Sequence, residues 1–499
     1  MKSQIISFEN LKEYEGCVLA YGHFSTIHPG HIRFLRYAKR KGKSLVVAVV
    51  DDYKEFGLEK YQFSQNDRVD ALSLISMADA IYPLKGNQIQ KVAEALSPSV
   101  FVLGKEFEIN PDSIVQSTID FLGKIKIPVE FHTGDIHYAT TDLLTFSERE
   151  IYEKRKSEFQ VSCKRQNIES RNLINSIEKW QSTKLTVIGD TIVDQFAACE
   201  ALGMSAEAPV VVVREIEHKN FLGGAAVVAS HIKSLGGKCD LISIAGEDEN
   251  RDVVEKELLD LGIGNLLVYD ASRPTTFKKR YIVENQKLFR VSRLEDKDVK
   301  AKIESELIDK LRYSCADSDG IVVSDFVYGV ITERILKELK IIANEKNIPL
   351  FGDIQCSSQI GSVTKFKGFS VLTPNEREAR IALRDKDCGL EKLSQKLIEI
   401  TNCQKLIMKL GAEGFIAYDN IDPSRVVSQP FPALSVNPLD LSGAGDSILA
   451  LISLGLSSKE EFMKIAALAS CISSIAVETM GNTPISANKL REKLQEILS

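Results

Sequence analysis

Short apolar runs alternate with amphipathic segments along this chain, and the alternation restricts the fold more than any other feature. The runs GCVLAYG (16–22) and SLVVAVVDD (44–52) are typical of buried strands, whereas HIRFLRYAKRKGK (31–43) places its apolar residues on one helical stripe. A strand, a helix and a second strand in this order predict parallel strands joined by a right-handed crossover. The same alternation resumes at LTVIGD (185–190). We therefore expect an α/β protein with two doubly wound domains.

A charged segment separates the two blocks. Residues 147–184 are mostly charged or polar and contain neither glycine nor proline. A run of this kind is more often a solvated surface than a binding site, so we expect a helical, solvated connector. The expected domains are therefore residues 1–146 and residues 185–499, joined by the linker 147–184.

Composition argues against several classes of protein. A hydrophobic share of 44% and a charged share of 26% are typical of a soluble globular chain, and the net charge of −6 gives no general attraction to nucleic acid or anionic lipid. No apolar run approaches the ~20 residues that span a bilayer, and the first residues do not resemble a signal peptide. The nine cysteines are scattered without a CxxC pair, which favours a reduced, cytoplasmic protein over a disulfide framework or a zinc knuckle.

The sequence DLSGAGDS (440–447) carries the sharpest chemical signal. Gly443, Ala444 and Gly445 have almost no side chains, so the backbone can approach a ligand closely. The apolar segment that follows predicts a helix whose first N–H groups point at that ligand. The carboxylate of Asp446 is suited to take a proton from an attacking hydroxyl, while the amides hold the charge of a migrating phosphoryl group. The plainer interpretation is an aspartate that caps the helix behind a glycine turn.

Four segments make the chain from about residue 185 onward resemble the ribokinase-like (pfkB) family of carbohydrate kinases: FLGGAAVVASHIKSLG (221–236), VLTPNEREA (371–379), KLGAEG (409–414) and the glycine loop. The resemblance implies that Asp446 is the catalytic base and that Gly443, Ala444 and Gly445 form the anion hole. The resemblance also implies contacts with three ligands. Mg²⁺ and its waters would be held by Asn375 and Glu378, and ATP by these two residues with Lys409, Gly411 and Gly414. The acceptor sugar would be held by Asp194, Gly223, Gly224, Lys278 and Arg280.

Three further segments, SAEAPVVVV (205–213), RPTTFKKRYIVENQKLFRV (273–291) and VVSDFVYG (322–329), are similar to the kinase half of the bifunctional ADP-heptose synthases. Basic residues in the acceptor site suit a sugar that already carries a phosphate. The chain departs from the usual pattern at Val227, where asparagine is common, at Tyr328, where lysine is common, and at GDIQ (352–355), which replaces Asp-Pro-Lys. We expect all three departures near the acceptor and away from the phosphoryl-transfer groups, so they leave the identity of the sugar open.

The stretch YGHFSTIHPGH (21–31) holds three of the seven histidines of the chain. It lies where a parallel strand is expected to pass into a helix. Imidazole and amide groups should converge there and neutralise a triphosphate during attack on its α-phosphorus. A zinc site lacks an obvious third ligand, and two surface histidines in a turn are the simpler alternative.

Residues 15–145 resemble the HxGH nucleotidyltransferases of the cytidylyltransferase-like kind. The resemblance implies that His28 and His31 are the catalytic pair. It also implies nucleotide contacts from five further positions, which are Gly22, Phe24, Arg68, Thr140 and Thr141. Ser25, Leu103 and Ala139 depart from the family pattern, which leaves open an inactive nucleotide-binding module.

The two resemblances together imply a bifunctional sugar kinase and sugar-1-phosphate nucleotidyltransferase. The expected route begins with ATP and D-glycero-D-manno-heptose 7-phosphate, uses Mg²⁺, and ends with adenylyl transfer to a heptose 1-phosphate for a surface glycan. The alternative is an active kinase on a different sugar, with an N-terminal domain that uses CTP or only binds nucleotide. The expected partners are sugar phosphates, nucleotides and a second copy bound through the kinase domain, but neither nucleic acid nor membrane.

Overall fold

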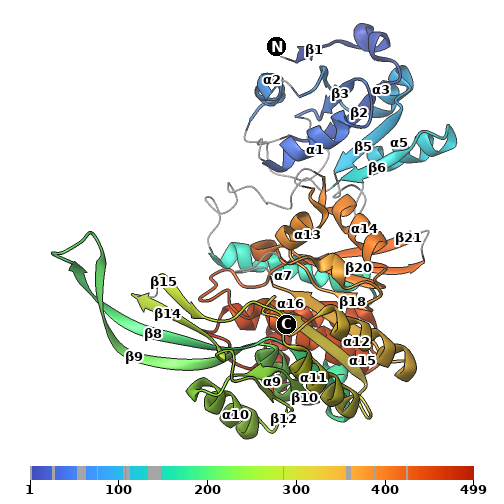
Figure 1. Cartoon of the computed structure of the whole chain (residues 1–499). Helices are drawn as coiled ribbons and strands as arrows, with labels where there is room; N and C mark the ends of the chain where they lie inside the picture. Colours follow the sequence, from blue (N-terminus) through green and yellow to red (C-terminus); the bar gives the residue numbers. More distant parts are fainter. Residues whose placement is uncertain are drawn as a thin grey trace. The chain divides into compact units, whose positions relative to one another are not determined.

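Figure 1 shows the computed structural model of the chain, which describes residues 3–24, 29–52, 63–75, 77–104, 107, 113–132, 148–284, 286–355, 361–385, 388–422 and 425–498. Five positions singled out in the sequence lie outside the described residues, namely Ser25, His28, Ala139, Thr140 and Thr141. The chain divides into two compact units, unit 1 (Met1–Thr145 with Arg384–Lys396) and unit 2 (Phe146–Leu383 with Leu397–Ser499).

Unit 1 is built on a six-stranded parallel sheet with the order β1-β4-β3-β2-β5-β6. The strands are β1 (Gln4–Ile5), β2 (Val18–Gly22), β3 (Leu45–Val49), β4 (Ala80–Pro83), β5 (Val100–Gly104) and β6 (Val129–His132), and the helices are η1 (Phe8–Tyr14), α1 (Pro29–Lys39), α2 (Gln65–Ile75), α3 (Ile89–Leu96) and α5 (Ser113–Lys124). Alternate residues of β2 point to opposite faces: Leu19 and Tyr21 pack with α3 and α5, whereas Val18 and Ala20 pack with α1 and α2. Helices therefore cover both faces of the sheet.

The chain reverses its course across this sheet next to β2. Strands β2, β3 and β4 follow one another toward one edge, and β5 then pairs with the other side of β2. Ligands of doubly wound sheets bind beyond the carboxyl ends of the strands at such a reversal. Gly22 ends β2, and His23 and Phe24 follow it, so these three residues lie at that end of the sheet.

Unit 2 contains a nine-stranded sheet with the order β12-β10-β7-β16-β17-β18-β19-β20-β21, parallel as far as β19 and antiparallel in the last two pairs. Its strands are β7 (Lys184–Gly189), β10 (Lys238–Ile242), β12 (Gly264–Asn265), β16 (Gly320–Asp325), β17 (Leu350–Ile354), β18 (Val371–Leu372), β19 (Lys405–Lys409), β20 (Phe415–Asp422) and β21 (Arg425–Phe431). The helices that follow or precede them are α9 (Ala225–Ser234), α10 (Glu249–Leu261), α11 (Ala301–Ser314), α12 (Glu333–Lys346), η3 (Val363–Lys365), α13 (Glu376–Leu383), η4 (Gly411–Glu413), α15 (Ala444–Ser457), α16 (Phe462–Val477) and α17 (Ala487–Leu498); the residues of α14 (Leu390–Thr401) are divided between the units.

Both faces of this sheet are also covered. Leu185 and Val187 of β7 join an apolar cluster with α9 and α15, whereas the hydroxyl of Thr186 lies 2.8 Å from that of Ser314 in α11 on the other face. The predicted α/β class, with two doubly wound units, is therefore confirmed.

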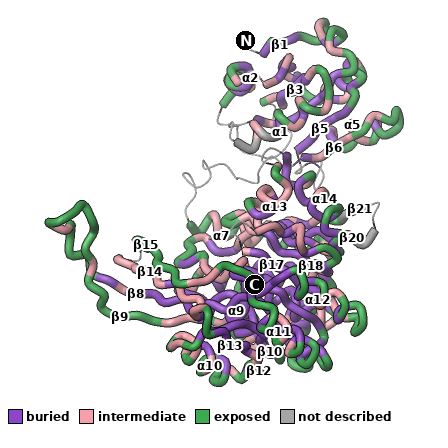
Figure 2. The backbone as a smooth tube through the Cα atoms, in the orientation of Figure 1, coloured by how far each residue is buried: buried purple, intermediate pink, exposed green. Residues whose placement is uncertain are grey.

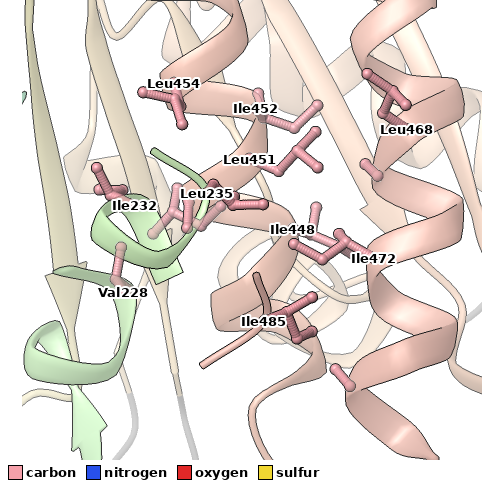
Figure 3. Close-up of a cluster of buried hydrophobic side chains, with 14 of the residues drawn as sticks. Val228, Ile232, Leu235, Ile448, Leu451, Ile452, Leu454, Leu468, Ile472 and Ile485 are labelled. Atoms are coloured by element: carbon pink, nitrogen blue, oxygen red, sulfur yellow. The ribbon is translucent and has the colours of Figure 1, made fainter. Parts of the chain in front are cut away.

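Helices α9, α15 and α16 pack together in the core of unit 2, as Figure 3 shows. The labelled side chains are Val228, Ile232 and Leu235 from α9, Ile448, Leu451, Ile452 and Leu454 from α15, Leu468 and Ile472 from α16, and Ile485. Each fully buried aliphatic side chain contributes about 1.5–3 kcal/mol, so this core fixes the position of α15 and of the loop that begins it. Within the described ranges, every helix falls short of the length or the hydrophobicity needed to traverse a bilayer.

A second, four-stranded sheet projects from the body of unit 2 (Figure 1), with the order β15-β14-β8-β9. Its strands are β8 (Thr191–Met204), β9 (Val211–Gly224), β14 (Thr276–Val283) and β15 (Gln286–Arg293); a further pair, β11 (Ile244–Ala245) and β13 (Val268–Tyr269), forms a sheet of its own. The start of β8 is buried, but the distal parts of β8 and β9 are exposed (Figure 2). Apolar side chains there, including Leu202, Met204 and Ile216, are open to solvent.

The charged segment before β7 forms helices, but one face of it is not solvated. Helices α7 (Glu148–Arg165), α8 (Ser170–Glu178) and η2 (Lys179–Ser182) belong to unit 2 and bury Phe159, Cys163, Leu173, Ile177 and Trp180 in its main apolar cluster. The expectation of a solvated connector needs this correction, because a few apolar residues at helical spacing suffice to hold a mostly charged helix against a core.

Candidate active site

The glycine loop begins helix α15 with a turn that only glycine accommodates easily. Gly443 is the N-cap residue and has φ +77°, in the left-handed region. A Cβ at this residue would lie 2.6 Å from the side-chain oxygen of Asn482. The strained backbone and the close neighbour both exclude larger residues, so the turn depends on glycine.

Bare amides surround the start of α15. Among the described residues, no protein acceptor receives the backbone N–H groups of Gly443, Ala444, Gly445 or Asp446. The first N–H groups of a helix have no partner inside it and carry the positive end of its dipole, so they favour a negatively charged ligand. The start of α15 therefore has the geometry of an anion-binding site, and its role as the anion hole of a kinase stays a prediction.

Asp446 lies in this first turn, and 4% of it is exposed. Burial, and then the negative charge of Asp353, raise the pKa of Asp446 to about 7, although the ammonium of Lys409 acts in the opposite direction. The side-chain amide of Gln355 donates to its Oδ1 across 3.5 Å, which is a long contact. A carboxylate whose pKa lies near neutral pH is suited to accept and release a proton.

Asp353, at the end of β17, joins several polar groups behind Asp446. The Lys409 ammonium lies 2.9 and 3.1 Å from its two oxygens, and Thr373 donates to Oδ1 across 2.8 Å. Burial lowers the pKa of Lys409, but the carboxylates of Asp353 and Glu378 outweigh that effect and raise it. Lys409 therefore stays an ammonium inside the protein.

Asn375 and Glu378 cap helix α13 reciprocally. The Asn375 N–H donates to Glu378 Oε2 across 2.8 Å, and the Glu378 N–H donates to Asn375 Oδ1 across 2.9 Å. This is the bonding pattern of a capping box, so both residues have a structural role whatever else they bind. Asn375 also pairs with Lys409 as a parallel bridge, which brings the two next to each other. Gly411 begins the turn η4 that follows Lys409, and Gly414 is the residue directly after it.

The residues expected to bind the acceptor lie on the second sheet. Asp194 on β8 forms an ion pair with Arg280 on β14 and accepts from the side-chain amide of Asn482 across 3.3 Å. Gly223, on β9, lies directly beside it, because a Cβ at this residue would be 3.1 Å from Asp194 Oδ2. The structure thus brings together Asp194, Gly223 and Arg280 and links them through Asn482 to the glycine loop.

Lys278 is buried two residues before Arg280 on the same strand. Its ammonium lies 5.1 Å from the ring centre of Phe326 and 5.2 Å from that of Tyr328, within the range of a cation–π interaction. Its charge acts on Asp446 and lowers the pKa of that carboxyl. Lys278 is therefore a buried cation between the second sheet and the start of α15.

Gly224 joins β9 to helix α9 and has φ +63°. A Cβ at this residue would lie 2.0 Å from the carbonyl oxygen of Asp190, so no side chain fits. Burial and the charge of Asp325 raise the pKa of Asp190 to about 7. Asp190 accepts the N–H groups of Phe326 (2.8 Å) and Tyr328 (3.3 Å), and so holds the loop that faces Lys278.

In unit 1, Phe24 is buried and has φ +47°, and its ring centre lies 5.1 Å from that of His31 at the start of α1. Arg68 on α2 is also buried. Its guanidinium donates to the carbonyl oxygens of His23 and Val50, and forms an ion pair with Asp52 at 2.8 Å. These bonds tie the end of β2 to the end of β3, a structural role that the sequence did not suggest. Its expected contact with nucleotide phosphates stays a prediction.

A model of the pfkB family of carbohydrate kinases matches residues 182–489, which is more than half of the 499 residues. The chain belongs to the pfkB family. A cytidylyltransferase-like model matches residues 19–133, in unit 1.

This pfkB-family chain has curated relatives named bifunctional protein HldE. One from Campylobacter jejuni is 30% identical over 315 residues, or 62% of this chain and 64% of the relative. Another, from Geobacter sulfurreducens, is 32% identical over 305 residues, or 60% of each chain. The match thus spans less than two thirds of these relatives.

Solved structures show the same fold at low identity. Phosphofructokinase-2 from Escherichia coli, in complex with substrates and products, superposes with a TM-score of 0.53 and 14% identity, covering 64% of this chain and all of that one. Another structure of that protein, in complex with potassium, gives a TM-score of 0.52 at the same 14% identity and covers 64% of this chain and 99% of that one. At this identity the likeness concerns the fold alone.

One expectation about the departures from the family pattern was wrong. Gln355 was placed with the acceptor and away from the phosphoryl-transfer groups, but its amide contacts both Asp446 and Asp353. Parallel strands end on one edge of the sheet, so a residue after β17 lies near the start of α15 although 91 residues separate them. Tyr328, beside Lys278, does lie on the acceptor side, and Val227 is fully buried in α9.

Sequence reasoning missed three further residues of this site. Asp353 binds Lys409, Asn482 bridges Asp194 and the glycine loop, and Asp190 holds the loop before Tyr328. Asp190 and Asp353 each follow or end an apolar strand, which is the signal that could have suggested them. Asn482 offers no such signal, because it lies in a loop far along the chain.

Proposed function

We propose that this chain is a bifunctional enzyme of nucleotide-sugar synthesis. Residues 185–499, together with the helices that precede them in unit 2, form a kinase domain that moves the γ-phosphoryl group of ATP to a sugar phosphate. Residues 1–146 couple a sugar 1-phosphate to a nucleotide and release pyrophosphate. The relatives' name, bifunctional protein HldE, and the two family models support two activities in one chain and do not favour the alternative of an inactive N-terminal module.

The proposed acceptor is D-glycero-D-manno-heptose 7-phosphate, which would become the 1,7-bisphosphate. A separate phosphatase would then remove the 7-phosphate before adenylyl transfer. Lys278, a buried cation on β14, supports an anionic acceptor, because a buried charge is stabilised by an opposite charge. Arg280, two residues further along, is already paired with Asp194.

One observation carries the kinase assignment: free amides at the start of α15 lie beside a buried carboxylate. The hydroxyl oxygen of the acceptor attacks the γ-phosphorus, and its proton passes to Asp446. The bond from phosphorus to the bridging oxygen breaks, and ADP leaves with the electron pair. The amides of Gly443 to Gly445 hold the negative charge that the phosphoryl oxygens carry during transfer.

Mg²⁺ is part of the proposal through the donor chemistry of α13. Asn375 and Glu378 provide amide and carboxylate oxygens, which Mg²⁺ prefers, and it commonly binds through water. One oxygen of each side chain already accepts a backbone N–H in the capping box, so these residues are better suited to hold Mg²⁺ through water than directly. When bound, the ion would neutralise charge on the phosphates of ATP.

Asp446→Asn tests the kinase assignment, because it keeps the shape of the side chain and removes the base. The variant should bind ATP nearly as well as the wild type, yet lower kcat by at least ~10²-fold, the usual scale for general-base catalysis. Mass spectrometry of a panel of phosphorylated sugars offered with ATP identifies the acceptor first. Unchanged kcat in the variant would reduce Asp446 to a helix cap.

A cytoplasmic location and a homodimer complete the proposal. The cysteines of the described part are all buried free thiols, as a reducing compartment allows. The exposed apolar side chains on β8 and β9 suit a second copy that would cover them. Sedimentation velocity should give a dimer for the wild type and a monomer for Met204→Glu/Ile216→Glu; a wild-type monomer at micromolar concentration would contradict the dimer.

A further inference from the structure

We propose that Lys409 and Gln355 complete the anion hole of the kinase: both donate to the phosphoryl group while it moves, and Asp353 holds them in position. This inference rests on the proposed function and adds catalytic residues to it. The sequence suggested only that Lys409 lies beside ATP, and it placed Gln355 at the acceptor.

The argument begins with the space over Gly445. A Cβ at this residue would lie 3.0 Å from the ammonium nitrogen of Lys409 and 3.5 Å from the amide nitrogen of Gln355. Both donors therefore lie next to the first turn of α15, which also contains the free N–H groups of Ala444 and Gly445. A phosphoryl group bound by those amides lies within reach of both side chains.

Asp353 holds the two donors in position but does not occupy all of their N–H bonds. Its oxygens bind the Lys409 ammonium at 2.9 and 3.1 Å, and Oδ2 accepts from Gln355 across 3.4 Å. An ammonium has three N–H bonds and Lys409 gives two of them to Asp353, so one remains for a ligand. The amide of Gln355 uses both of its N–H bonds, one on Asp353 and one on Asp446, so it donates to the phosphoryl group in place of its long 3.5 Å contact with Asp446. Because β17 and β19 are both anchored in the main sheet, the donors are preorganised, which is what stabilisation of a transition state requires.

The positive charge at this edge of the sheet comes from β19. The ammonium of Lys409 reaches Asp353 from that strand, whereas Gln355, directly after β17, contributes a neutral amide. The two strands therefore present one charged and one neutral donor.

In the reaction, a bond forms between the acceptor oxygen and the γ-phosphorus while the bond to the bridging oxygen of ADP breaks. The acceptor proton goes to Asp446, and ADP takes the electron pair. Lys409 and Gln355 exchange no proton or electron pair, because they only donate hydrogen bonds to the oxygens of the phosphoryl group.

Lys409→Met is the main test. It should lower kcat by about 10²–10³-fold, as loss of one oxyanion donor does, while the KM for ATP changes less than about fivefold. Gln355→Met should lower kcat about tenfold at unchanged KM, because a neutral donor is weaker than a charged one. The matched control is Lys405→Met, which removes a lysine paired with Asp419 from the same strand and should change kcat less than about twofold.

Two further measurements separate catalysis from folding. In the Lys409→Met background, Gln355→Lys should recover kcat at least about tenfold, because it restores a cation beside Asp353. Binding of ADP with aluminium fluoride, which imitates the migrating group, should weaken in Lys409→Met, while binding of ADP alone should not. The same comparison with Gln355→Met covers the case in which Lys409→Met does not fold.

Asp353→Asn tests the positioning role. Asp353, Asp194, Lys409 and Lys278 are the charged groups that act on Asp446, and removing one negative charge favours its ionised form. The acid limb of the kcat profile should therefore move to lower pH. Loss of the position of Lys409 and Gln355 should in addition lower kcat on the plateau above that limb, whereas an aspartate that acts only through its charge would move the limb and leave the plateau in place.

The inference fails if the wild type phosphorylates an acceptor while Lys409→Met raises only the KM for ATP, or while Gln355→Met keeps full kcat. Absence of phosphorylation by the wild type, across a panel of sugars and sugar phosphates, would instead overturn the proposed function itself.

Discussion

Asp446 and Asp190 are two buried carboxylates of unit 2 whose pKa is raised to about 7, but their surroundings differ. Asp190 accepts backbone N–H groups from Phe326 and Tyr328, so its oxygens are used by the protein. Among the described residues, Asp446 receives a hydrogen bond only from Gln355, at 3.5 Å. Asp190 therefore holds a loop, whereas Asp446 keeps its oxygens for a ligand.

The pH dependence of phosphorylation follows from the pKa of Asp446. A general base works in its ionised form, and burial raises the pKa of this carboxyl to about 7. We expect kcat to fall about tenfold for each pH unit below about 6.5 and to level off above about 7.5. Stopped assays from pH 5.5 to 9 at saturating ATP and acceptor measure this. A flat profile down to pH 5.5 would show that no group with a raised pKa limits the reaction.

The sequence suggested the residues that we propose to react, but not the residues that support them. Asp446 and Gly443–Gly445 are contiguous, so their chemistry can be inferred from local order alone. Asp353 and Asn482 reach the site through pairing of strands and loops that local spacing does not determine. The phosphate contact predicted for Arg68 illustrates the same limit, because the motif does not reveal that the carbonyl groups of His23 and Val50 lie beside it.

Among the elements, the start of α9 depends on backbone geometry as much as the start of α15 does. Gly224 combines φ +63° with a carbonyl oxygen 2.0 Å from the position of a Cβ, so Gly224→Ala should cost well over the ~1–2 kcal/mol of left-handed strain alone. Urea unfolding measures the loss of stability.

Gly368→Ala is the matched control for this change. Gly368 has φ +77° in the same unit, but nothing lies within 4 Å of the position of its Cβ, so it should show only the strain. Equal losses of stability in the two variants would mean that the Asp190 carbonyl moves away at no cost.

Elements with a strong hydrophobic pattern were predicted correctly, whereas the burial of the segment before β7 was not. The apolar runs at 185–190 and 16–22 contain strands β7 and β2, each paired in parallel with both of its neighbours, as expected. Residues 147–184 were correctly expected to be helical, but their charge concealed a buried face that includes Phe159 and Trp180. The average polarity of the segment predicted that it is exposed, but the spacing of a few apolar side chains places one face of it in the core.

At the scale of the whole molecule, the two units are separate compact bodies, so each reaction should be removable without the other. His31→Ala in the full chain should abolish release of pyrophosphate from a sugar 1-phosphate and ATP, and leave sugar phosphorylation within about twofold of the wild type. Asp446→Asn should show the reverse. A loss of both activities in either variant would mean that the units do not work independently.

Trp180 is the one tryptophan of the sequence, and it is fully buried in unit 2. Its emission therefore reports unfolding of the kinase half without any label. The same burial also determines which fragments of the chain can fold. A kinase fragment that starts at residue 185 would lack Phe159, Leu173 and Trp180, and its core would contain apolar cavities. A fragment intended to fold as the kinase unit should therefore begin at or before Phe146.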